Sequence, residues 1–292
     1  MSLSSPRLGG LRIVSLALNL PGPAALMQCR QMGARCLKLE PPAGDPMRIY
    51  SPQAYDQLHE GVTVQVANLK TPEGQAALHA ELAHADVLIT SFRPSALRRL
   101  GLDWATLHAR HPRLSQVAIV GASGARAEEP GHDLTYQAEH DLVTGLNLPA
   151  SLHADMGGAL AAMQAVLQAA LLRAQGQEGD FFEVGLADAA GFLALPRRWG
   201  LTTPAGAVGG AHAGYRVYAC RDGRVAVAAL EPHFAAALCA AAGHATGASG
   251  DVQALMQAPV HDALAAFFAQ HTRSQLEQLA STHDLPLHTL PP

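Results

Sequence analysis

Apolar residues follow two different spacings along the first two-thirds of the chain. Short aliphatic and β-branched runs, each long enough for one buried strand, alternate with stretches in which apolar residues have helical spacing. Strands that alternate with helices are typical of βαβ units and a mostly parallel sheet. The expected strands are Arg12–Leu18, Cys36–Leu39, Val62–Val66, Asp86–Thr90, Leu114–Val120 and Phe181–Gly185.

Turn and cap residues fit between these runs. Thr71, Pro72 and Glu73 supply an N-cap, a proline at the first helical position and an early acidic residue. We therefore predict an open, doubly wound α/β domain, Rossmann-like and mostly parallel, over residues 1–196.

The pattern changes after Pro196. Residues 197–214 are rich in Gly, Ala, Thr and Pro without a period, which predicts a linker. Tyr215–Cys220 and Val225–Ala229 then flank an Asp-Gly step, which predicts a β-hairpin. Helical patterns around Pro232–Ala242, Val260–Gln270 and Ser274–Ser281 complete a smaller α+β domain over residues 215–292.

Composition bounds the size of the core and argues against a nucleic-acid partner. With 292 residues and 49% hydrophobic content, the chain can bury a large core in two domains. The formal net charge of −4 and the presence of only two lysines, Lys38 and Lys70, provide no basic face, so we expect no nucleic-acid partner.

The cysteines and the long apolar run indicate a cytoplasmic protein. Four cysteines show neither a zinc pattern nor a disulfide framework, so we expect reduced thiols and no metal site. The N-terminus lacks the basic start and apolar core of a secretory signal. Gly157–Ala174 is strongly apolar but carries Gln164, Gln168 and Arg173, which favours a buried helix over a membrane span, and we expect no membrane partner.

The main candidates for chemistry are His132 and Asp155. His132 lies in a Gly-His-Asp sequence, and Asp155 follows 23 residues later at the head of the long apolar helix. An imidazole and a carboxylate on opposite sides of one pocket could remove a proton from one face of a carbon and return it to the other. The competing interpretations are a structural histidine and a helix-capping aspartate.

Asp155 occupies the expected N-cap of that helix. Backbone N–H groups at a helix start, here those of Asp155 and Met156, can hold an oxyanion such as an enolate. Gly157 and Gly158 would allow a ligand to approach closely.

Two further side chains fit such a site. Glu231 follows an apolar hairpin strand and could orient a histidine ring, or it could simply be an acid at a helix start. Arg93 follows the fourth strand, where its guanidinium would suit a phosphate, although a plain surface arginine is the alternative. A GxGxxG loop is absent, and Ser123 lacks a nucleophile-elbow context, which argues against a nucleotide loop and a hydrolase triad.

Together these residues resemble the class III (family III) CoA-transferase superfamily, and within it the racemase branch. The resemblance runs from Leu11 to about Pro286, and compared with that family the chain is expected to be shortened at its C-terminus. The matching segments are Leu37–Pro46, Leu69–Gly74, Ala85–Pro94, Leu100–Trp104, Gly131–Leu134 and Tyr215–Phe234.

The resemblance implies roles for individual residues. His132, Asp155 and Glu231 would be the catalytic residues, while Arg93 and Lys38 would meet the phosphates of coenzyme A. The substrate would be an acyl-CoA thioester of fatty acid metabolism, with coenzyme A as part of the substrate and no other cofactor. The family fold implies an interlocked homodimer, in which Glu231 would serve His132 of the other subunit.

Three functions remain open at this point. The first is a racemase that inverts the α-carbon of a 2-methylacyl-CoA through an enolate. The second is a CoA-transferase in which Asp155 forms an anhydride and then a thioester. The third is a non-catalytic homologue that binds acyl-CoA. Retention of both His132 and Glu231 favours the first.

Overall fold

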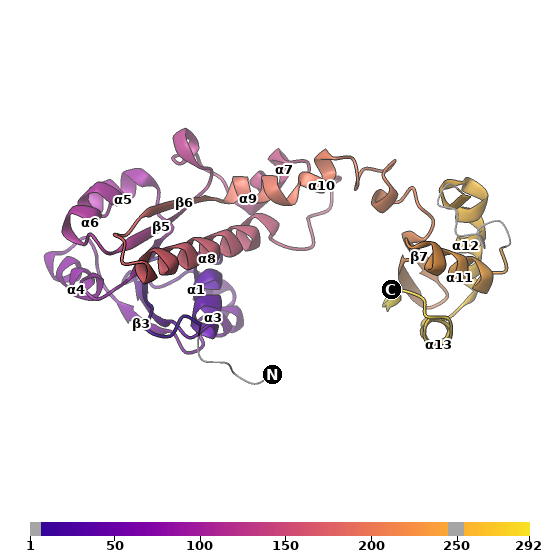
Figure 1. The fold of residues 1–292 in the computed structure, drawn as a ribbon, viewed down its shortest axis with the longest axis horizontal. Coiled ribbons are helices and arrows are strands. Elements are labelled where there is room, and N and C mark those ends of the chain that lie inside the picture. Colours follow the sequence, from indigo (N-terminus) through magenta and orange to yellow (C-terminus); the bar gives the residue numbers. More distant parts are fainter. Residues whose placement is uncertain (1–6, 245–253) are drawn as a thin grey trace. The chain divides into compact units, whose positions relative to one another are not determined.

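The computed structural model describes residues 7–244 and 254–292. The chain divides into two compact units, Met1–Ala194 and Leu195–Pro292 (Figure 1). Each unit buries an apolar core of its own.

The first unit is built on a six-stranded sheet with the order β3-β2-β1-β4-β5-β6. Every pairing in the sheet is parallel. The prediction of a doubly wound α/β domain with six strands is confirmed, with ends that differ by up to three residues. The strands are β1 (Arg12–Ser15), β2 (Arg35–Glu40), β3 (Thr63–Val66), β4 (Val87–Thr90), β5 (Ser115–Val120) and β6 (Phe181–Gly185).

The order of the strands determines where a ligand can bind. The chain runs outward from β1 to β3, then returns to the other side of β1 and runs from β4 to β6. In open parallel sheets the crevice forms at such a reversal, beyond the carboxyl ends of the strands. The ends of β1 and β4 therefore mark the expected site.

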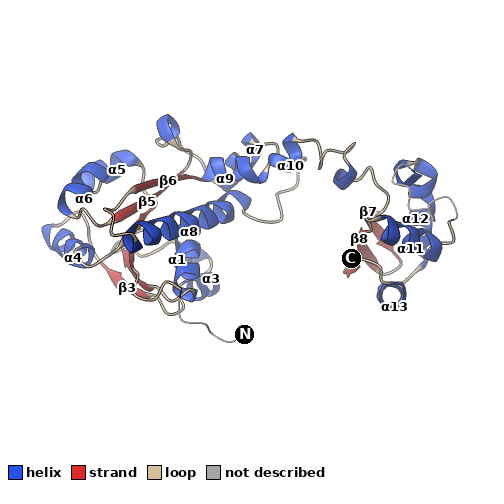
Figure 2. Cartoon of the chain, in the orientation of Figure 1, coloured by secondary structure: helices blue, strands red, loops and turns tan. Residues whose placement is uncertain are grey.

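Helices cover both faces of this sheet (Figure 2). Because side chains alternate along a strand, Ile13 joins the core against α1 and α8, whereas Val14 joins the core against α4, α5 and α6. The helices of this unit are α1 (Pro21–Gln31), α2 (Met47–Tyr50), α3 (Pro52–Leu58), α4 (Pro72–Leu82), α5 (Pro94–Leu100), α6 (Trp104–Arg110), α7 (Asp133–Glu139), α8 (His153–Ala174) and α9 (Leu186–Leu193), with a 3₁₀ turn, η1, at Gly124–Arg126.

Helix α8 has one buried and one exposed apolar face. Small residues, including Ala159, Ala162 and Ala165, face the core. Leu160, at 52% exposure, and Leu171, at 59%, lie on the opposite face. The prediction of a buried helix is thus correct for one face only. Within the described residues, α8 alone is long and apolar enough to cross a membrane, a criterion that core helices also meet.

The described residues of the second unit form a three-stranded antiparallel sheet and three longer helices. Strands β7 (Tyr215–Cys220) and β8 (Gly223–Ala228) form the predicted hairpin, with Arg221 and Asp222 in the turn and Gly223 paired with Cys220. A third strand, β9 (Leu287–Leu290), pairs with β8 and was not predicted. The helical elements are α10 (Leu195–Arg198), α11 (Pro232–Ala241), α12 (Ala258–Gln270) and α13 (Arg273–His283), with 3₁₀ turns at Ala207–Gly209 and Ala254–Met256.

Candidate active site

A pocket of about 340 Å³ opens at the carboxyl ends of β1, β4 and β5. Its walls come from the segments that follow these strands, among them Leu18 and Asn19 after β1 and Ser91 after β4. His132 and Asp155 both line this pocket. The structure therefore brings together the two residues that the sequence placed in one site.

His132 is the N-cap residue of α7. Its backbone N–H donates to Thr135 Oγ1 at 3.0 Å, and the Thr135 hydroxyl donates to the His132 carbonyl at 2.7 Å. This reciprocal arrangement fixes the backbone at His132, while its side chain is exposed at the pocket. The ring is thus placed to meet a bound molecule.

Asp155 lies in the first turn of α8 and not at the N-cap. The N-cap residue is Leu152, so the predicted capping position of Asp155 is wrong by three residues. Burial and, to a smaller extent, the negative charge of Asp133 raise the pKa of the Asp155 carboxyl from 3.8 to about 6, while His132 opposes the shift. A carboxyl group with this pKa can accept and return a proton near neutral pH.

Asp133 connects the two helices that carry the candidate bases. Its carboxylate is buried and accepts from the backbone N–H of Asp155 at 3.0 Å and from Gln137 Nε2 at 2.5 Å. We did not assign it a role from the sequence, although it directly follows His132. Its position satisfies one of the N–H groups of the first turn of α8.

The backbone groups that we expected to hold an enolate are already bonded. The Asp155 N–H donates to Asp133, and the Met156 N–H donates to the Leu152 carbonyl at 2.9 Å. A Cβ on Gly157 would lie 3.0 Å from Leu193 Cδ1, and one on Gly158 would lie 2.2 Å from Leu186 Cδ2. The two glycines therefore allow α9 to pack closely, and the roles of Met156 and Gly157 in ligand binding stay predictions.

Tyr136 is a wall residue that the sequence reasoning missed. Its ring lies against two glycines, because a Cβ on Gly121 would lie 2.3 Å from the Tyr136 hydroxyl and one on Gly131 would lie 2.5 Å from its Cε1. The side chain is buried and lines the pocket. Burial and the charge of Asp155 raise the pKa of Tyr136, which keeps the phenol protonated as a hydrogen-bond donor.

Arg93 lies where the sequence predicts it. It is the N-cap residue of α5, its side chain is exposed, and it lines the pocket with His132. An exposed guanidinium at the rim of a pocket can meet a phosphate without losing an existing buried partner.

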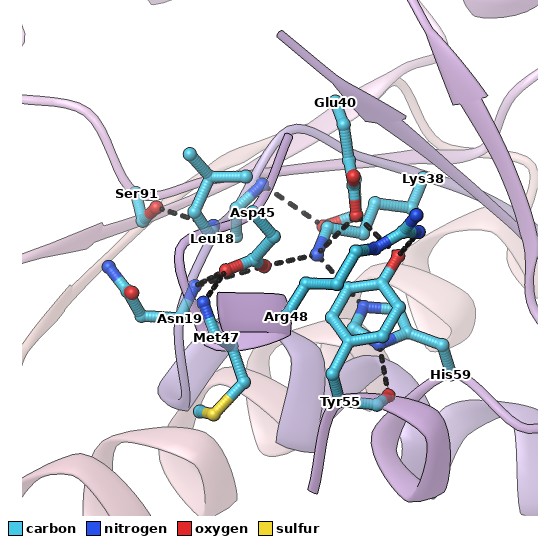
Figure 3. A network of polar contacts seen from close by, with 12 residues as sticks. Leu18, Asn19, Lys38, Glu40, Asp45, Met47, Arg48, Tyr55, His59 and Ser91 are labelled. Atoms are coloured by element: carbon cyan, nitrogen blue, oxygen red, sulfur yellow. Dashed lines mark hydrogen bonds and ion pairs between the residues drawn. The ribbon is translucent and has the colours of Figure 1, made fainter. Parts of the chain in front are cut away.

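Lys38, by contrast, cannot meet a phosphate. Its side chain is 0% exposed, and its Nζ contacts Asp45 Oδ2 at 2.5 Å, Glu40 Oε1 at 3.3 Å and His59 Nε2 at 2.9 Å (Figure 3). The predicted contact of Lys38 with coenzyme A is therefore wrong. The signal was in the sequence, because Lys38 and Glu40 stand two apart in a strand and face the same side.

The same network bears on the prediction that no metal is present. Oxygen and nitrogen atoms of Glu40, Asp45 and His59 lie within 4.8 Å of one another, a spacing that could hold a cation. The Lys38 ammonium already supplies the positive charge that these carboxylates need. A metal ion would have to displace it.

Glu231 belongs to the second unit. It is the N-cap residue of α11, its side chain makes no capping hydrogen bond, and it is exposed. Arg93, His132 and Asp155 of the first unit therefore share a pocket, and the role of Glu231 stays a prediction.

Comparison with known proteins agrees with this architecture. Cinnamoyl-CoA:phenyllactate CoA-transferase of Clostridium sporogenes is 35% identical over 139 residues, which are 43% of this chain and 34% of that protein. Succinate–glutarate CoA-transferase of Agrobacterium fabrum is 31% identical over 206 residues, 63% of this chain and 52% of that protein. Human alpha-methylacyl-CoA racemase is 26% identical over 247 residues, 78% of this chain and 62% of that protein. The chain thus spans only part of each relative.

Solved structures show the same fold. A CAIB/BAIF family protein from Brucella suis has a TM-score of 0.81 at 23% identity, covering 99% of this chain and 84% of that one. The hypothetical protein Rv3272 of Mycobacterium tuberculosis has a TM-score of 0.83 at 23% identity, covering 97% and 84%. The family model for CoA-transferase family III matches residues 8–290. The chain belongs to CoA-transferase family III.

Proposed function

We propose that this chain is an acyl-CoA racemase that inverts the α-carbon of a 2-methylacyl-CoA by two-base proton transfer. The observation that carries the proposal is that His132 and Asp155 line one pocket at the topological switch of the sheet. Human alpha-methylacyl-CoA racemase, at 26% identity, is among the relatives.

The chemistry requires one proton to be removed and one to be returned. In one direction the Asp155 carboxylate takes the α-proton, the electron pair moves onto the thioester oxygen as an enolate, and protonated His132 returns a proton to the opposite face. In the other direction the two residues exchange roles. A thioester makes this feasible because it stabilises the anion better than a free acid does, and a pKa of about 6 lets Asp155 act in both directions.

The rim of the pocket supports a coenzyme A substrate. Arg93 presents an exposed guanidinium beside the pocket, where it would bind a phosphate of the CoA moiety. The Tyr136 phenol and the residues after β1 would then surround the thioester end.

The exposed face of α8 supports a homodimer. Leu152, Met156, Leu160, Leu167 and Leu171 recur at helical spacing, and all are at least 38% exposed. An apolar stripe of this length is typical of a surface that another protein covers. In the dimer, Glu231 of the second unit would be supplied to His132 by the partner subunit.

The test is proton exchange at the α-carbon. A single epimer of a 2-methylacyl-CoA is incubated with the enzyme in deuterated water, and epimerisation and deuterium uptake are followed by NMR and mass spectrometry. We expect both in the wild type and neither in His132→Ala or Asp155→Asn. Tight CoA binding with no exchange would refute the proposal and favour a non-catalytic acyl-CoA-binding protein.

A second candidate is CoA transfer through Asp155. Relatives that are more than 30% identical include three CoA-transferases, those of Clostridium sporogenes, Agrobacterium fabrum and Acetobacter aceti. In that reaction the Asp155 carboxylate attacks the thioester carbonyl and expels the CoA thiolate, which then attacks the resulting anhydride to give an aspartyl-CoA thioester and the free acid. Hydroxylamine would convert the thioester to a hydroxamate, and a mass shift at Asp155 would establish transfer.

A further inference from the structure

The buried charges around Lys38 form a network of polar contacts (Figure 3). The Lys38 ammonium lies against two carboxylates, Asp45 at 2.5 Å and Glu40 at 3.3 Å, and all three side chains are at most 2% exposed. Burying a lysine costs several kcal/mol unless its charge and all three of its N–H groups find partners. Such a network adds little to stability compared with an apolar core of the same volume, which indicates a role other than stabilising the fold.

His59 completes the set of acceptors. Its Nε2 lies 2.9 Å from Lys38 Nζ, and because an ammonium group has only donors, this nitrogen must be unprotonated. The proton is then on Nδ1, which donates to the Tyr55 carbonyl at 2.6 Å. Burial lowers the pKa of His59, which favours this neutral form. Lys38 therefore donates to Asp45, Glu40 and His59.

Only one of the two carboxylates reaches the pocket wall. Both oxygens of Asp45 lie 3.1 Å from the backbone nitrogen of Asn19, and Oδ1 also accepts from the Met47 N–H at 2.9 Å. Glu40 instead accepts from the Tyr55 hydroxyl at 2.7 Å. Asn19 lines the pocket with His132 and Asp155, so of the two carboxylates it is Asp45 that links the buried charges to the candidate site.

Several hydrogen bonds hold the wall segment. Asn19 has a left-handed backbone with φ of 63°, a conformation that asparagine adopts more readily than most residues other than glycine. The Tyr50 hydroxyl donates to Asn19 Oδ1 at 3.1 Å, and the Leu18 N–H donates to Ser91 Oγ at 3.2 Å. The Asp45 carboxylate is the one charged group among these contacts.

We propose that Asp45, held in place by Lys38, is a positioning residue that fixes the Leu18–Asn19 wall of the pocket that His132 and Asp155 also line. Lys38 acts through Asp45 and touches neither coenzyme A nor the acyl group. The inference rests on the proposed function, because it assigns the wall to the site of that reaction.

Glu40 offers a matched control for Asp45. Both carboxylates contact Lys38 and both are buried, but only Asp45 contacts the wall. In Asp45→Asn one side-chain oxygen remains as an acceptor, whereas the wild-type carboxylate offers two oxygens to Lys38, Asn19 and Met47. The substitution also removes the negative charge. Glu40→Gln removes the same charge and keeps an oxygen for Tyr55.

The experiment compares the two variants by α-proton exchange of 2-methylacyl-CoA, below the temperature at which either unfolds. We expect both variants to lose stability. In Asp45→Asn, kcat should fall about tenfold, which corresponds to about 1.4 kcal/mol of activation free energy, whereas in Glu40→Gln it should stay within about twofold of wild type. KM should change by less than about twofold in either, because neither residue contacts coenzyme A. Equal losses of kcat in the two variants, or a loss confined to KM, would overturn the inference.

A second measurement keeps this inference separate from the proposed function. Amide hydrogen exchange at Leu18 and Asn19 should be faster in Asp45→Asn than in Glu40→Gln, whatever reaction the protein catalyses. Equal amide exchange in the two variants would overturn the wall-holding role. If the wild type shows no α-proton exchange but the two variants differ in amide exchange, only the proposed reaction is refuted. If the single variants do not fold, Lys38→Met/Asp45→Asn and Lys38→Met/Glu40→Gln, which remove opposite charges together, provide the same comparison.

Discussion

Replacing Asp155 by Asn should make the protein more stable at neutral pH and barely change it in acid. The carboxyl has its pKa raised from 3.8 to about 6 by burial and by Asp133, so its ionised form is unfavourable in the folded state. An unfolded chain does not share this penalty. The wild type therefore loses stability as the pH rises from 3.8 to about 6, and above that range the full penalty remains.

The magnitude follows from the size of the shift. At about 1.4 kcal/mol per pKa unit, the difference between 3.8 and about 6 gives about 3 kcal/mol above pH 6. Because the carboxyl faces a pocket open to solvent, we reduce this to about 2 kcal/mol. Linkage then predicts that the stability gained by Asp155→Asn grows by about 1 kcal/mol between about pH 5 and about pH 7.5.

Urea unfolding of both proteins at these pH values, followed by circular dichroism, measures the difference. The comparison across pH cancels any constant effect of the amide on packing, and the hydrogen bond from the Asp155 backbone to Asp133 is retained. In an Asp133→Asn background the dependence on pH should shrink, because one of the two causes of the shift is removed. A difference that stays constant or falls with pH would refute the reasoning.

Three further predictions concern the same pocket. The rate of α-proton exchange with Asp155 as the base should fall as the pH drops through about 6, because the carboxyl becomes protonated. Asp133→Asn should move this limb of the kcat/KM profile to lower pH. A limb that does not move would contradict the cause assigned to the pKa shift. Gly121→Ala should lower the free energy of unfolding by about 1–3 kcal/mol, because its Cβ would lie 2.3 Å from the Tyr136 hydroxyl. Adding Tyr136→Phe to this variant removes that hydroxyl and should restore part of the lost stability in thermal melts. Arg93→Ala should raise KM for acyl-CoA by about tenfold or more without affecting a pantetheine thioester that lacks the nucleotide phosphates; an equal effect on both substrates would place Arg93 elsewhere in the mechanism.

Much of the fold could be predicted because parallel strands covered on both faces are continuous apolar runs. The segment Val87–Thr90 is buried throughout, and its pattern alone identifies it. Strand β9 was missed because Leu287–Leu290 is short, contains His288 and Thr289, and forms the edge of a small sheet. Its pairing with β8 depends on a contact far away in the sequence.

The sequence placed His132 and Asp155 in one site, in agreement with the pocket that both line, but it did not predict their surroundings. Both residues stood out because they lie where a turn or loop leads into a helix, and polar side chains at such positions often serve function. Lys38 was misassigned because a lysine in a strand can face a ligand or a buried carboxylate, and its two-residue spacing from Glu40, which favours the second, was not weighed. Likewise, the two glycines after Asp155 serve a neighbouring helix, which only the packing of α9 against α8 reveals.

The short Gly-His-Asp sequence combines three physical tasks that the fold makes interdependent. Gly131 leaves room for the Tyr136 ring, His132 begins α7 with its side chain at the pocket, and Asp133 turns inward to bond the first turn of α8. The same Asp133 charge raises the pKa of Asp155. One carboxylate thus fixes the position of the second base and adjusts its proton affinity, so the distance between the two candidate bases and the acidity of one of them cannot vary independently.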